Sequence, residues 1–504
     1  MPEILTLKPE ERQSTLRTLK SPRLLKTEVL AGLVVALALI PEAIAFSLIA
    51  GVDPAIGLFA ASTMAISISF LGGRPAMISA ATAATALVVA PIVESHGVEY
   101  LFATVILAGI IQVLLAIVGV AKLMRFIPRS VMVGFVNALA ILIFVAQLPD
   151  LIGVPWLVYP LTVIGLAIIL LLPKLTQAVP APLVTIVLLT LAAVAFNLDL
   201  PSVGDKGELP STLPVLTLPA VPFTWETLQV IAPPAFSMAV VGLLESLMTA
   251  KLVDDITDTR SSKVRESFGQ GASNVISGFF GGMGGCAMIG QTMINVKASG
   301  ARTRISTFMA GVLVMVLAVT LGQVVALIPM AALVSVMIFV SIATFDWHSI
   351  RPSTLRSMPK SETTVMLMTV LATVGTNNLA IGVGLGVLTA MVMFTQRVAH
   401  FATVTRAVIG EGDAAIARYT VDGELFFASS NDLYTQFDYA NDPPHIEIDM
   451  TQSHLWDAST IATLDSVEAK YRQYNKSVDI VGLNTASQRM RERMTGKFGA
   501  DSAE

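Results

Sequence analysis

The sequence predicts an α-helical polytopic membrane protein with 14 spans that contain a duplicated unit, followed by a small α/β domain. Three observations support this fold class. Apolar residues make up 54% of the 504 residues and charged residues 13%, with a mean hydropathy of +0.73. One unusual arrangement, an acidic residue inside an apolar run followed by glycines, occurs at Glu42 and again at Glu245. After Arg397 the composition becomes polar and mixed.

This composition also limits the partners and the chemistry. A chain so rich in apolar residues is typical of proteins that cross the bilayer many times, so lipid is its first expected partner. The net charge of -4 comes from acidic residues in loops and in the C-terminal region, which does not favour a nucleic-acid partner. Cys286 is the single cysteine, which excludes an internal disulfide and a thiolate metal cluster. We expect it to be a small packing residue.

We placed the spans from apolar runs of about 20 residues and from the Lys/Arg content at their ends. Residues 1–28 then form a cytoplasmic N-terminal segment, and 29–400 form the membrane domain with repeats at about 29–196 and 230–400. The proline-rich loop from about 197 to 229 lies outside. Arg74 fits poorly, since we expect it at the outer side or in the middle of the membrane. The spans begin near residues 29, 54, 76, 101, 129, 159, 180, 230, 267, 286, 303, 329, 363 and 379.

The repeated arrangement has the same three parts in both copies. Glu42 interrupts LALIPEAIAFSLI, and Gly72 and Gly73 precede AMISAATAATALVVAPIV. Glu245 interrupts AVVGLLESLMTA, and a second set of glycines precedes CAMIGQTMINV. The nearly equal spacing indicates a duplicated unit, and short spans after glycine are typical of the half-helices of secondary transporters. We expect hinges at Gly72, Gly73, Gly281, Gly282, Gly284 and Gly285.

Two half-helices can form an anion site without a basic side chain. The exposed N–H groups of a first helical turn are equivalent to about half a positive charge, and two such ends would meet at mid-membrane. The alternative for each residue is close helix packing, which is common for small residues in membrane helices. The predicted substrate-binding residues are Ala81, Thr82, Thr85, Ala287, Met288, Ile289 and Gln291.

The two glutamates inside apolar spans are expected to have a functional role. A carboxylate at mid-membrane costs about 2.5 to 3.5 kcal/mol even on lenient scales, so such residues rarely lack a role. Glu245 lies one turn before Thr249, so both side chains can face one cavity, where Glu245 either binds a coupling ion or pairs with a buried polar group. For Glu42, which follows Pro41, coupling, gating and hydration of the vestibule all remain open. No cofactor is expected beyond a proton or Na⁺, and no metal site.

Electrostatics favours symport. An anion beside a carboxylate in a low-dielectric site is repelled unless a cation neutralises the carboxylate. A proton needs no further ligand, whereas sodium needs several oxygens, for which Thr249 and backbone carbonyls are the candidates. We therefore expect proton coupling.

The chain resembles the sulfate permease (SulP) family of anion transporters over nearly its whole length. The matching segments are IPEAIAFSLIAGVDPAIGLFAA, RPAMISAATAA and FGQGASNVISGFFGGMGGCAMIGQTMINVKASG. IDMTQSHLWDAST is similar to the corresponding part of the STAS domain. The resemblance implies that the 14 spans form a seven-plus-seven inverted repeat divided into a core and a gate domain. It also implies a substrate site between the half-helices of spans three and ten, a cation role for Glu245, and cytoplasmic STAS domains in a homodimer. Many eukaryotic relatives carry an arginine where this chain has Met288 to Gln291, which puts chloride or oxalate exchange of the animal type in doubt.

The polar C-terminal region, 408–504, is expected to be a small α/β domain. TVDGELFFA, HIEIDM and SVDIVGL have the character of strands, and helices are expected from about Ser459 to Tyr474 and at the end through Arg493. The region contains no set of nucleophile, base and orienting residue, so we expect no enzyme activity.

We therefore expect a proton-coupled anion symporter of the cell (inner) membrane that works by alternating access, with both termini cytoplasmic. Sulfate, bicarbonate and a C4-dicarboxylate all suit a site built from helix ends. A sodium-coupled bicarbonate carrier or an anion exchanger is the alternative within transport. A nucleobase permease shares the inverted-repeat architecture but lacks a STAS domain, and a non-transporting membrane protein that signals through STAS is a third possibility.

Overall fold

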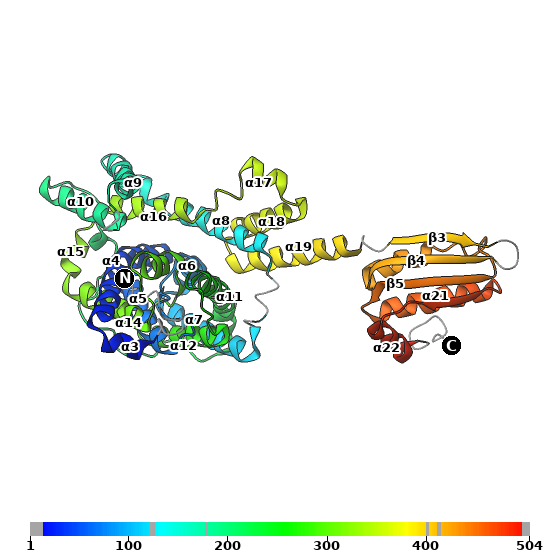
Figure 1. Ribbon diagram of the computed structural model, residues 1–504. Coiled ribbons are helices and arrows are strands. Elements are labelled where there is room, and N and C mark those ends of the chain that lie inside the picture. The colour runs from blue at the N-terminus through cyan, green and yellow to red at the C-terminus, as the bar shows by residue number, and fades with distance from the viewer. Residues whose placement is uncertain are drawn as a thin grey trace. The chain divides into compact units, whose positions relative to one another are not determined.

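The computed structural model describes residues 14–120, 122, 127–176, 180–399, 403–410 and 415–495. The chain forms two compact units, Met1–Val387 and Leu388–Glu504, and the division falls inside helix α19 (Leu379–Ala399) (Figure 1). Of the expected N-terminal segment, residues 1–13 lie outside the described part. The remainder holds the short helix α3 (Thr15–Lys20), capped by Ser14.

Each of the 14 predicted spans contains a helix, most of them beginning within a few residues of the expected position. By length and composition, seven helices among the described residues are long and apolar enough to cross a membrane alone, and four more are shorter and apolar. This confirms the multi-span membrane fold. The helices of the 14 spans are α4 (Pro22–Ala50), α5 (Pro54–Leu71), α6 (Ala83–His96), α7 (Val98–Val118), α8 (Arg129–Ala146), α9 (Val158–Leu175), α10 (Ala181–Ala195), α11 (Trp225–Thr257), α12 (Lys263–Phe279), α13 (Ile289–Met293), α14 (Arg304–Thr320), α16 (Met330–Thr344), α18 (Lys360–Thr376) and α19.

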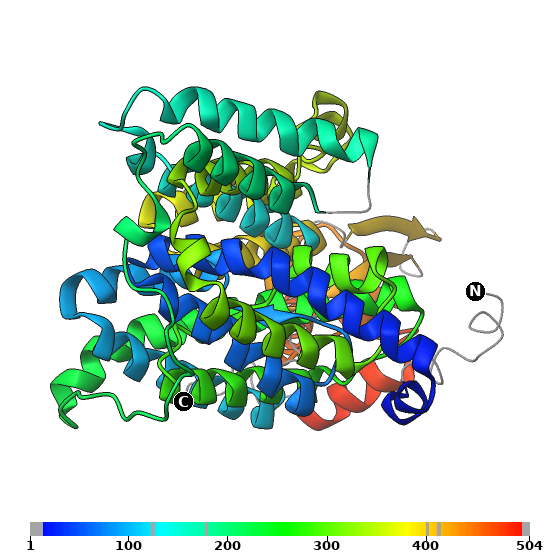
Figure 2. The ribbon, with the colours of Figure 1, turned by 90° about the vertical axis from the view of Figure 1, so that its left-hand side faces the viewer.

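The membrane helices sort into a core group and a gate group. The core consists of α4–α7 and α11–α14, in which α12 packs on α5 and α7, and α14 packs on α4 and α5. The gate contains α8, α9, α10, α16 and α18, in which α8 packs on α18 and α16 on α9. Figures 1 and 2 show the gate helices gathered along one side of the core. Both groups draw helices from both halves of the chain, as the inverted repeat predicts.

Large apolar side chains cover the outside of the membrane unit. Ile117 on α7 is 72% exposed, and Val163 on α9 is 64% exposed. Such extensive apolar exposure is unusual for a soluble protein and is expected where lipid covers the surface.

The core is held together on its inside by small and polar residues of α12. Gln270, Ser273 and Asn274 on this helix are fully buried. A Cβ added at Gly109 on α7 would lie 2.5 Å from the carbonyl oxygen of Gly271, so the two helix backbones approach too closely for any side chain there. Small residues at such contacts are how membrane helices pack without a hydrophobic driving force between them.

The C-terminal unit is a four-stranded sheet with order β3-β4-β5-β6, flanked by three helices. Strands β3 and β4 are antiparallel, whereas β4, β5 and β6 are parallel. The expected strands at β4, β5 and β6 and the helices α21 and α22 are present; β3 and α20 were not predicted. β3 begins before residue 408 and is exposed along almost its whole length, so it shows no alternation of apolar and polar residues. The elements are β3 (Thr403–Ile409), β4 (Ile416–Leu425), α20 (Phe427–Thr435), β5 (His445–Leu455), α21 (Ala458–Gln473), β6 (Ser477–Val481) and α22 (Thr485–Met494).

A buried carboxylate organises one end of this domain. Asp442 accepts hydrogen bonds from the Tyr419 hydroxyl at 2.7 Å, the Tyr471 hydroxyl at 2.5 Å and Arg406 Nε at 2.8 Å. Burial beside this carboxylate raises the pKa of Tyr419 and of Tyr471 above the usual value for tyrosine. Because every oxygen of the buried group has a donor, the network stabilises the domain.

Candidate functional site

The centre of the core is a crossing of two extended segments from the two repeats. β1 (Ser79–Ala80) and β2 (Cys286–Ala287) pair in antiparallel fashion, with Ser79 opposite Ala287 and Ala80 opposite Cys286. Helix α6 follows β1; α13 and the π-helix η4 (Ile294–Ala298) follow β2. A 14-residue helix such as α6 spans about 21 Å, less than the hydrocarbon core of about 30 Å. Both spans are therefore half-helices preceded by extended chain.

Glycine permits this crossing. A Cβ at Gly285 would lie 1.9 Å from the carbonyl oxygen of Ala80, a distance that no side chain can occupy. Gly281 and Gly284 have φ angles of +69° and +67°, in the left-handed region that favours glycine. The second glycine run is thus required by the fold of β2.

The other expected hinge glycines lie in close contacts. A Cβ at Gly73 would lie 2.1 Å from the carbonyl oxygen of Ser262, and one at Gly282 would lie 2.4 Å from the Ser277 hydroxyl. A Cβ at Gly72 would lie 2.8 Å from the backbone oxygen of its own helix at Ile68. These contacts explain the glycines sterically, and hinge motion at them stays a prediction.

Side chains from four elements hold the chain around β1 in place. Each uses a polar group to satisfy backbone or side-chain atoms of residues 76 to 79, which have left the helical hydrogen-bond pattern. Sequence reasoning missed these residues; their signal was the number of amides and hydroxyls within otherwise apolar spans. The bonds are Asn295 Nδ2 to Ala76 O at 2.8 Å, Thr307 Oγ1 to Met77 O at 3.2 Å, Ile78 N to Thr292 Oγ1 at 3.0 Å and Gln270 Nε2 to Ser79 Oγ at 2.6 Å.

Asn274 and Ser246 hold β2 in the same manner. Asn274 accepts a hydrogen bond from the Gly285 N–H at 2.8 Å and donates to the Gly285 carbonyl at 3.1 Å. It also donates to Gln112 Oε1 at 2.9 Å. Ser246, next to Glu245 on α11, accepts from the Ala287 N–H at 3.1 Å. The position of β2 is therefore tied to the helix that carries Glu245.

The N-terminus of α6 is capped by two of the predicted substrate residues. Thr82 is the N-cap, and its hydroxyl accepts from the Thr85 N–H at 3.3 Å. The Thr85 hydroxyl donates back to the Thr82 carbonyl at 3.0 Å. Both threonines are buried, as is Ala81. The Thr85 hydroxyl thus serves the cap, while the first-turn N–H groups of Ala83 and Ala84 have no partner within the helix.

The N-terminus of α13 is open on one side. Its N-cap, Met288, makes no side-chain cap hydrogen bond. Gly290 is exposed, and a Cβ there would meet no atom within 4 Å. Ala287 and Met288 are buried behind it, Ile289 is partly buried, and Gln291 is 2% exposed. Among the described residues, no donor reaches Gln291 Oε1.

Glu245 lies directly behind β2. Its side chain is buried, and Cys286 Sγ donates to Glu245 Oε2 at 2.9 Å. The same sulfur lies 3.2 Å from Thr82 Oγ1. Cys286 is buried, as expected of a packing residue, and its thiol also connects two polar groups, which the sequence did not predict. Thr249 is also buried and one turn from Glu245, but its hydroxyl donates to the Glu245 backbone carbonyl at 2.8 Å.

Glu42 approaches the site from the first repeat. It is partly buried on α4, and its carboxyl group interacts with the side chain of Gln291 on α13. Glu42 and Glu245 therefore contact neighbouring residues of one segment, 286–291, although they come from different repeats. In the described part of the chain, neither carboxyl group pairs with a lysine or an arginine.

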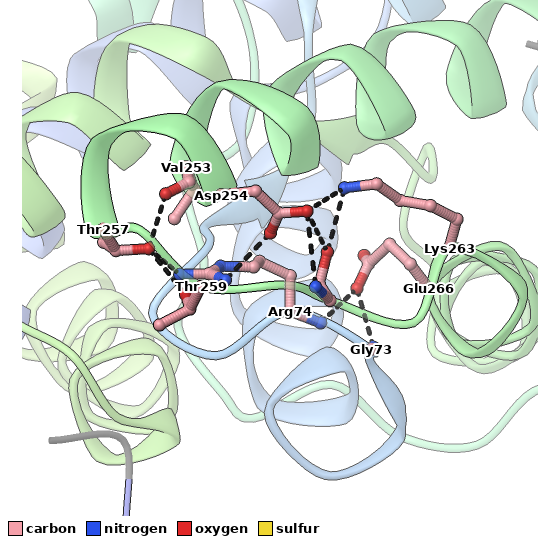
Figure 3. Close-up of polar contacts among 9 residues, drawn as sticks. Gly73, Arg74, Val253, Asp254, Thr257, Thr259, Lys263 and Glu266 are labelled. Carbon is pink, nitrogen blue, oxygen red and sulfur yellow. Dashed lines mark hydrogen bonds and ion pairs between the residues drawn. The ribbon is translucent and has the colours of Figure 1, made fainter. Parts of the chain in front are cut away.

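Arg74 was expected at the outer side or in the middle of the membrane, but it lies in a polar cluster where the chain leaves α11 and enters α12 (Figure 3). The buried guanidinium pairs with Asp254 near the C-terminal end of α11, and Asp254 also pairs with Lys263 at 2.8 Å. The reason is the direction of the chain, since α5 is the second span and returns to the side on which α4 begins. Arg74 thus shares its side with Lys263 in the loop before α12, which we expected to be cytoplasmic.

The same cluster is connected to β1. Glu266 accepts hydrogen bonds from the N–H groups of Gly73 at 2.7 Å and Arg74 at 2.8 Å, as Figure 3 shows. Gln270 donates to the other Glu266 oxygen at 2.9 Å and to the Ser79 hydroxyl. A continuous set of polar contacts therefore links the end of α11 to the extended segment at the centre.

The architecture and the two half-helices agree with the comparison of the chain with known families. The family model described as the Sulfate permease family matches residues 25–164 and 154–369. The chain belongs to the sulfate permease family. This permease is 50% identical to the putative sulfate transporter YbaR of Bacillus subtilis over 93% of its own length and 97% of that protein. It is 24% identical to the bicarbonate transporter BicA of Picosynechococcus over 94% of its length and 91% of that protein.

Solved structures agree with the fold of the permease. The transmembrane domain of a cyanobacterial BicA matches with a TM-score of 0.64 and 26% identity, covering 72% of this chain and 98% of that one. The murine anion transporter Slc26a9 in its inward-facing state matches with a TM-score of 0.79 and 16% identity, covering 93% and 87%. This second match covers 93% of the chain and so extends into the C-terminal unit, where the expected small α/β domain is present. The permease is an anion transporter and not an enzyme.

Proposed function

We propose that this permease is a proton-coupled symporter of a small oxyanion. The anion binds between the N-termini of α6 and α13, and Glu245 takes up the proton. The observation that supports this most is the position of Glu245. Its carboxyl group accepts a hydrogen bond from the Cys286 thiol, and that thiol also contacts the hydroxyl of Thr82, the N-cap of α6. An anion at that helix end and an ionised Glu245 would repel each other at short range, whereas a protonated Glu245 removes the repulsion.

The anion site uses helix ends in place of cations. The first-turn N–H groups of two helices would surround the anion, and each helix end contributes about half a positive charge. The open space at Gly290 gives access to the α13 end. Gln291, whose Oε1 has no donor among the described residues, would orient its amide nitrogen toward either the anion or Glu42.

Sulfate is the first anion to test. The relatives with 50% and 27% identity, YbaR and YvdB of Bacillus subtilis, are named putative sulfate transporters. Sulfate carries two charges and presents four acceptor oxygens, which suits two converging sets of N–H donors. Bicarbonate, because of the BicA relatives, and a C4-dicarboxylate belong in the same panel.

Proton coupling requires less of the site than sodium coupling. Na⁺ needs several oxygens in one place, and beside Glu245 the side-chain candidates are its own carboxylate and the Thr249 oxygen, whose hydroxyl hydrogen donates to the Glu245 backbone carbonyl. The proton needs only the Glu245 carboxyl group. Glu42, which contacts Gln291, is then a second acidic residue, and it controls the access of the anion to the site.

We further propose the inner membrane as the location and a homodimer as the assembly, with both termini on the cytoplasmic side. The topology is supported by the Arg74, Lys263 and Arg265 positions, which lie on one side of the core, as the positive-inside rule expects of the cytoplasm.

Proton influx into proteoliposomes tests the proposal. Vesicles loaded with a pH dye receive sulfate, bicarbonate, fumarate, chloride or uracil, and protein-free vesicles correct for diffusion of CO₂. We expect one oxyanion to acidify the lumen with the parent protein and not with Glu245→Gln. Glu226→Gln, an exposed acid on the same helix, is the matched control and keeps the flux.

The other possible results of this experiment would identify one of the alternative functions. Uptake of labelled anion that follows a sodium gradient without acidification indicates a sodium-coupled carrier, and uptake that requires an internal anion indicates an exchanger. Acidification by uracil indicates a nucleobase permease. No uptake of any of these solutes by a folded protein would favour a signalling role and would reject the proposed function.

A further inference from the structure

Buried hydrogen bonds connect Glu245 to the N-terminus of α6 through the single cysteine. Cys286 Sγ lies 2.9 Å from Glu245 Oε2 and 3.2 Å from Thr82 Oγ1. Thr82 in turn accepts from the Thr85 N–H. Cys286 and Thr82 are at most 3% exposed and Glu245 is 8% exposed, so bulk water does not compete for these bonds.

Few ionisable groups surround Glu245. The elements packed against this part of α11 are α6, α7, α12, β2 and α13. Around this part of α11, Thr82 lies against Cys286, Gln112 of α7 donates to the Ala239 carbonyl, and Asn274 of α12 donates to the Gly285 carbonyl. None of these side chains is charged, nor is Thr85 of α6 or Gln291 of α13. Cys286 of β2 is the ionisable side chain that contacts its carboxyl group within the described chain. Glu42 on α4 is the second carboxyl group of the site and contacts Gln291.

We infer that Cys286 is a positioning residue that transmits the protonation state of Glu245 to the anion end of α6. The inference rests on the proposed function. With Glu245 ionised, the thiol donates its hydrogen to the carboxylate, and the Thr82 hydroxyl donates its hydrogen to the sulfur. With Glu245 protonated, the carboxylate no longer holds the thiol hydrogen, which turns to Thr82 Oγ1. The Thr82 hydroxyl hydrogen then leaves the sulfur and donates to the anion at the helix end in place of Thr85 Oγ1, which lies 3.1 Å away.

This change in hydrogen-bond direction couples proton binding to anion binding in the way that symport requires. No covalent bond changes except the O–H bond formed when Glu245 takes up its proton; the thiol and hydroxyl hydrogens only rotate. Protonation adds one donor at the anion site, so anion affinity rises when the proton binds. By linkage, the bound anion strengthens proton binding by the same factor.

The test is the pH dependence of anion affinity in the purified, full-length permease. Sulfate binding is measured at pH 6 and pH 8, with fumarate as the probe if fumarate is the anion that acidifies the vesicles. We expect the parent to bind about tenfold more tightly at the lower pH, within the usual range of coupling. In Cys286→Ala the ratio falls to about twofold, and in Cys286→Ser, which keeps a donor and an acceptor, most of the ratio returns.

Two further variants keep the test decisive. Thr82→Val removes the other end of the path and lowers the ratio as Cys286→Ala does, and it replaces that variant if Cys286→Ala does not fold. Ser62→Ala, which removes a buried hydroxyl bonded to the Gly311 carbonyl elsewhere in the core, keeps the parent ratio. A parent with neither proton flux nor pH-dependent affinity rejects the proposed function. A coupled parent with an equally coupled Cys286→Ala or Thr82→Val rejects the role of Cys286 alone.

Discussion

Arg74 Nη1 lies 2.9 Å from Asp254 Oδ1, and this ion pair joins the segment that leads into β1 to the end of the helix that carries Glu245. The guanidinium is almost fully buried and also donates to the hydroxyls of Thr257 at 2.6 Å and Thr259 at 2.8 Å. Its geometry explains why an arginine is tolerated so close to the half-helices of the core. The pair fixes two parts of the site relative to each other.

Loss of this guanidinium should destabilise the core. Breaking a buried ion pair from one side costs about 3 to 5 kcal/mol, because the remaining charge is left without its partner. Since Asp254 keeps Lys263, we expect Arg74→Ala to lie at the lower end of that range. Arg74→Lys keeps the charge but cannot reach Asp254 and both threonines together, and should be intermediate. Thermal unfolding in detergent measures both, and equal melting temperatures for parent and Arg74→Ala would contradict the prediction.

Gly285→Ala should abolish transport. The new Cβ would meet the Ala80 carbonyl oxygen at 1.9 Å, so β1 and β2 could not keep their register. Gly290→Ala is the matched control for folding, since the Cβ there meets open space. We expect the control to express and melt like the parent, whereas Gly285→Ala loses anion uptake in vesicles. Normal uptake by Gly285→Ala would mean that the crossing is looser than the contacts indicate.

Thr249→Val separates the two coupling ions. Valine has the shape of threonine but no hydroxyl, and the hydroxyl it replaces donates to the Glu245 backbone carbonyl. A sodium site would lose its side-chain ligand, whereas a proton site would keep the Glu245 carboxyl group. We expect anion-driven acidification to fall less than threefold in this variant. A loss comparable to that of Glu245→Gln would favour sodium.

The C-terminal domain should lose stability in alkali. The folded state raises the pKa of Tyr419 and Tyr471, so their contribution to stability is complete below the ordinary tyrosine pKa of about 10 and declines as the pH rises above it. Urea unfolding of the domain at pH 9 and pH 11 measures the decline. Tyr471→Phe removes one donor to Asp442 and should cost about 1 to 3 kcal/mol at pH 7, with a smaller decline in alkali. Identical pH profiles for the two proteins would contradict this.

The spans and half-helices could be predicted from the sequence because both depend on local patterns. Apolar runs fix where the chain can cross the bilayer, and glycine before a short run marks a broken helix, as at Gly285 before α13. The polar contacts of the core could not be predicted. Cys286, Asn274 and Gln270 acquire their roles from partners far away in the chain, and spacing does not report such partners. Arg74 follows the second span, which returns to the side on which the first span begins, and this direction of the chain explains its position beside Asp254, which also pairs with Lys263.

In the C-terminal domain, strands with one buried face were predictable and the exposed strand was not. β5 alternates buried and exposed residues along its first half, which gives the pattern of period two. β3 has almost no buried residue, so its sequence resembles a linker. The predicted strand TVDGELFFA ends at Ala428 and so includes the first two residues of α20, and the rest of this helix was not predicted.

The antiparallel contact of β1 and β2 is made by main-chain atoms, and Ala80, Ala81 and Ala287 beside it contribute only methyl groups. A binding site that is built from main-chain atoms changes little when side chains are substituted. Changes at neighbouring positions such as Met288 or Gln291 can then alter which anion fits while the frame that presents the helix ends persists. A common scaffold of this kind can serve relatives named for sulfate and relatives named for bicarbonate without rebuilding its centre.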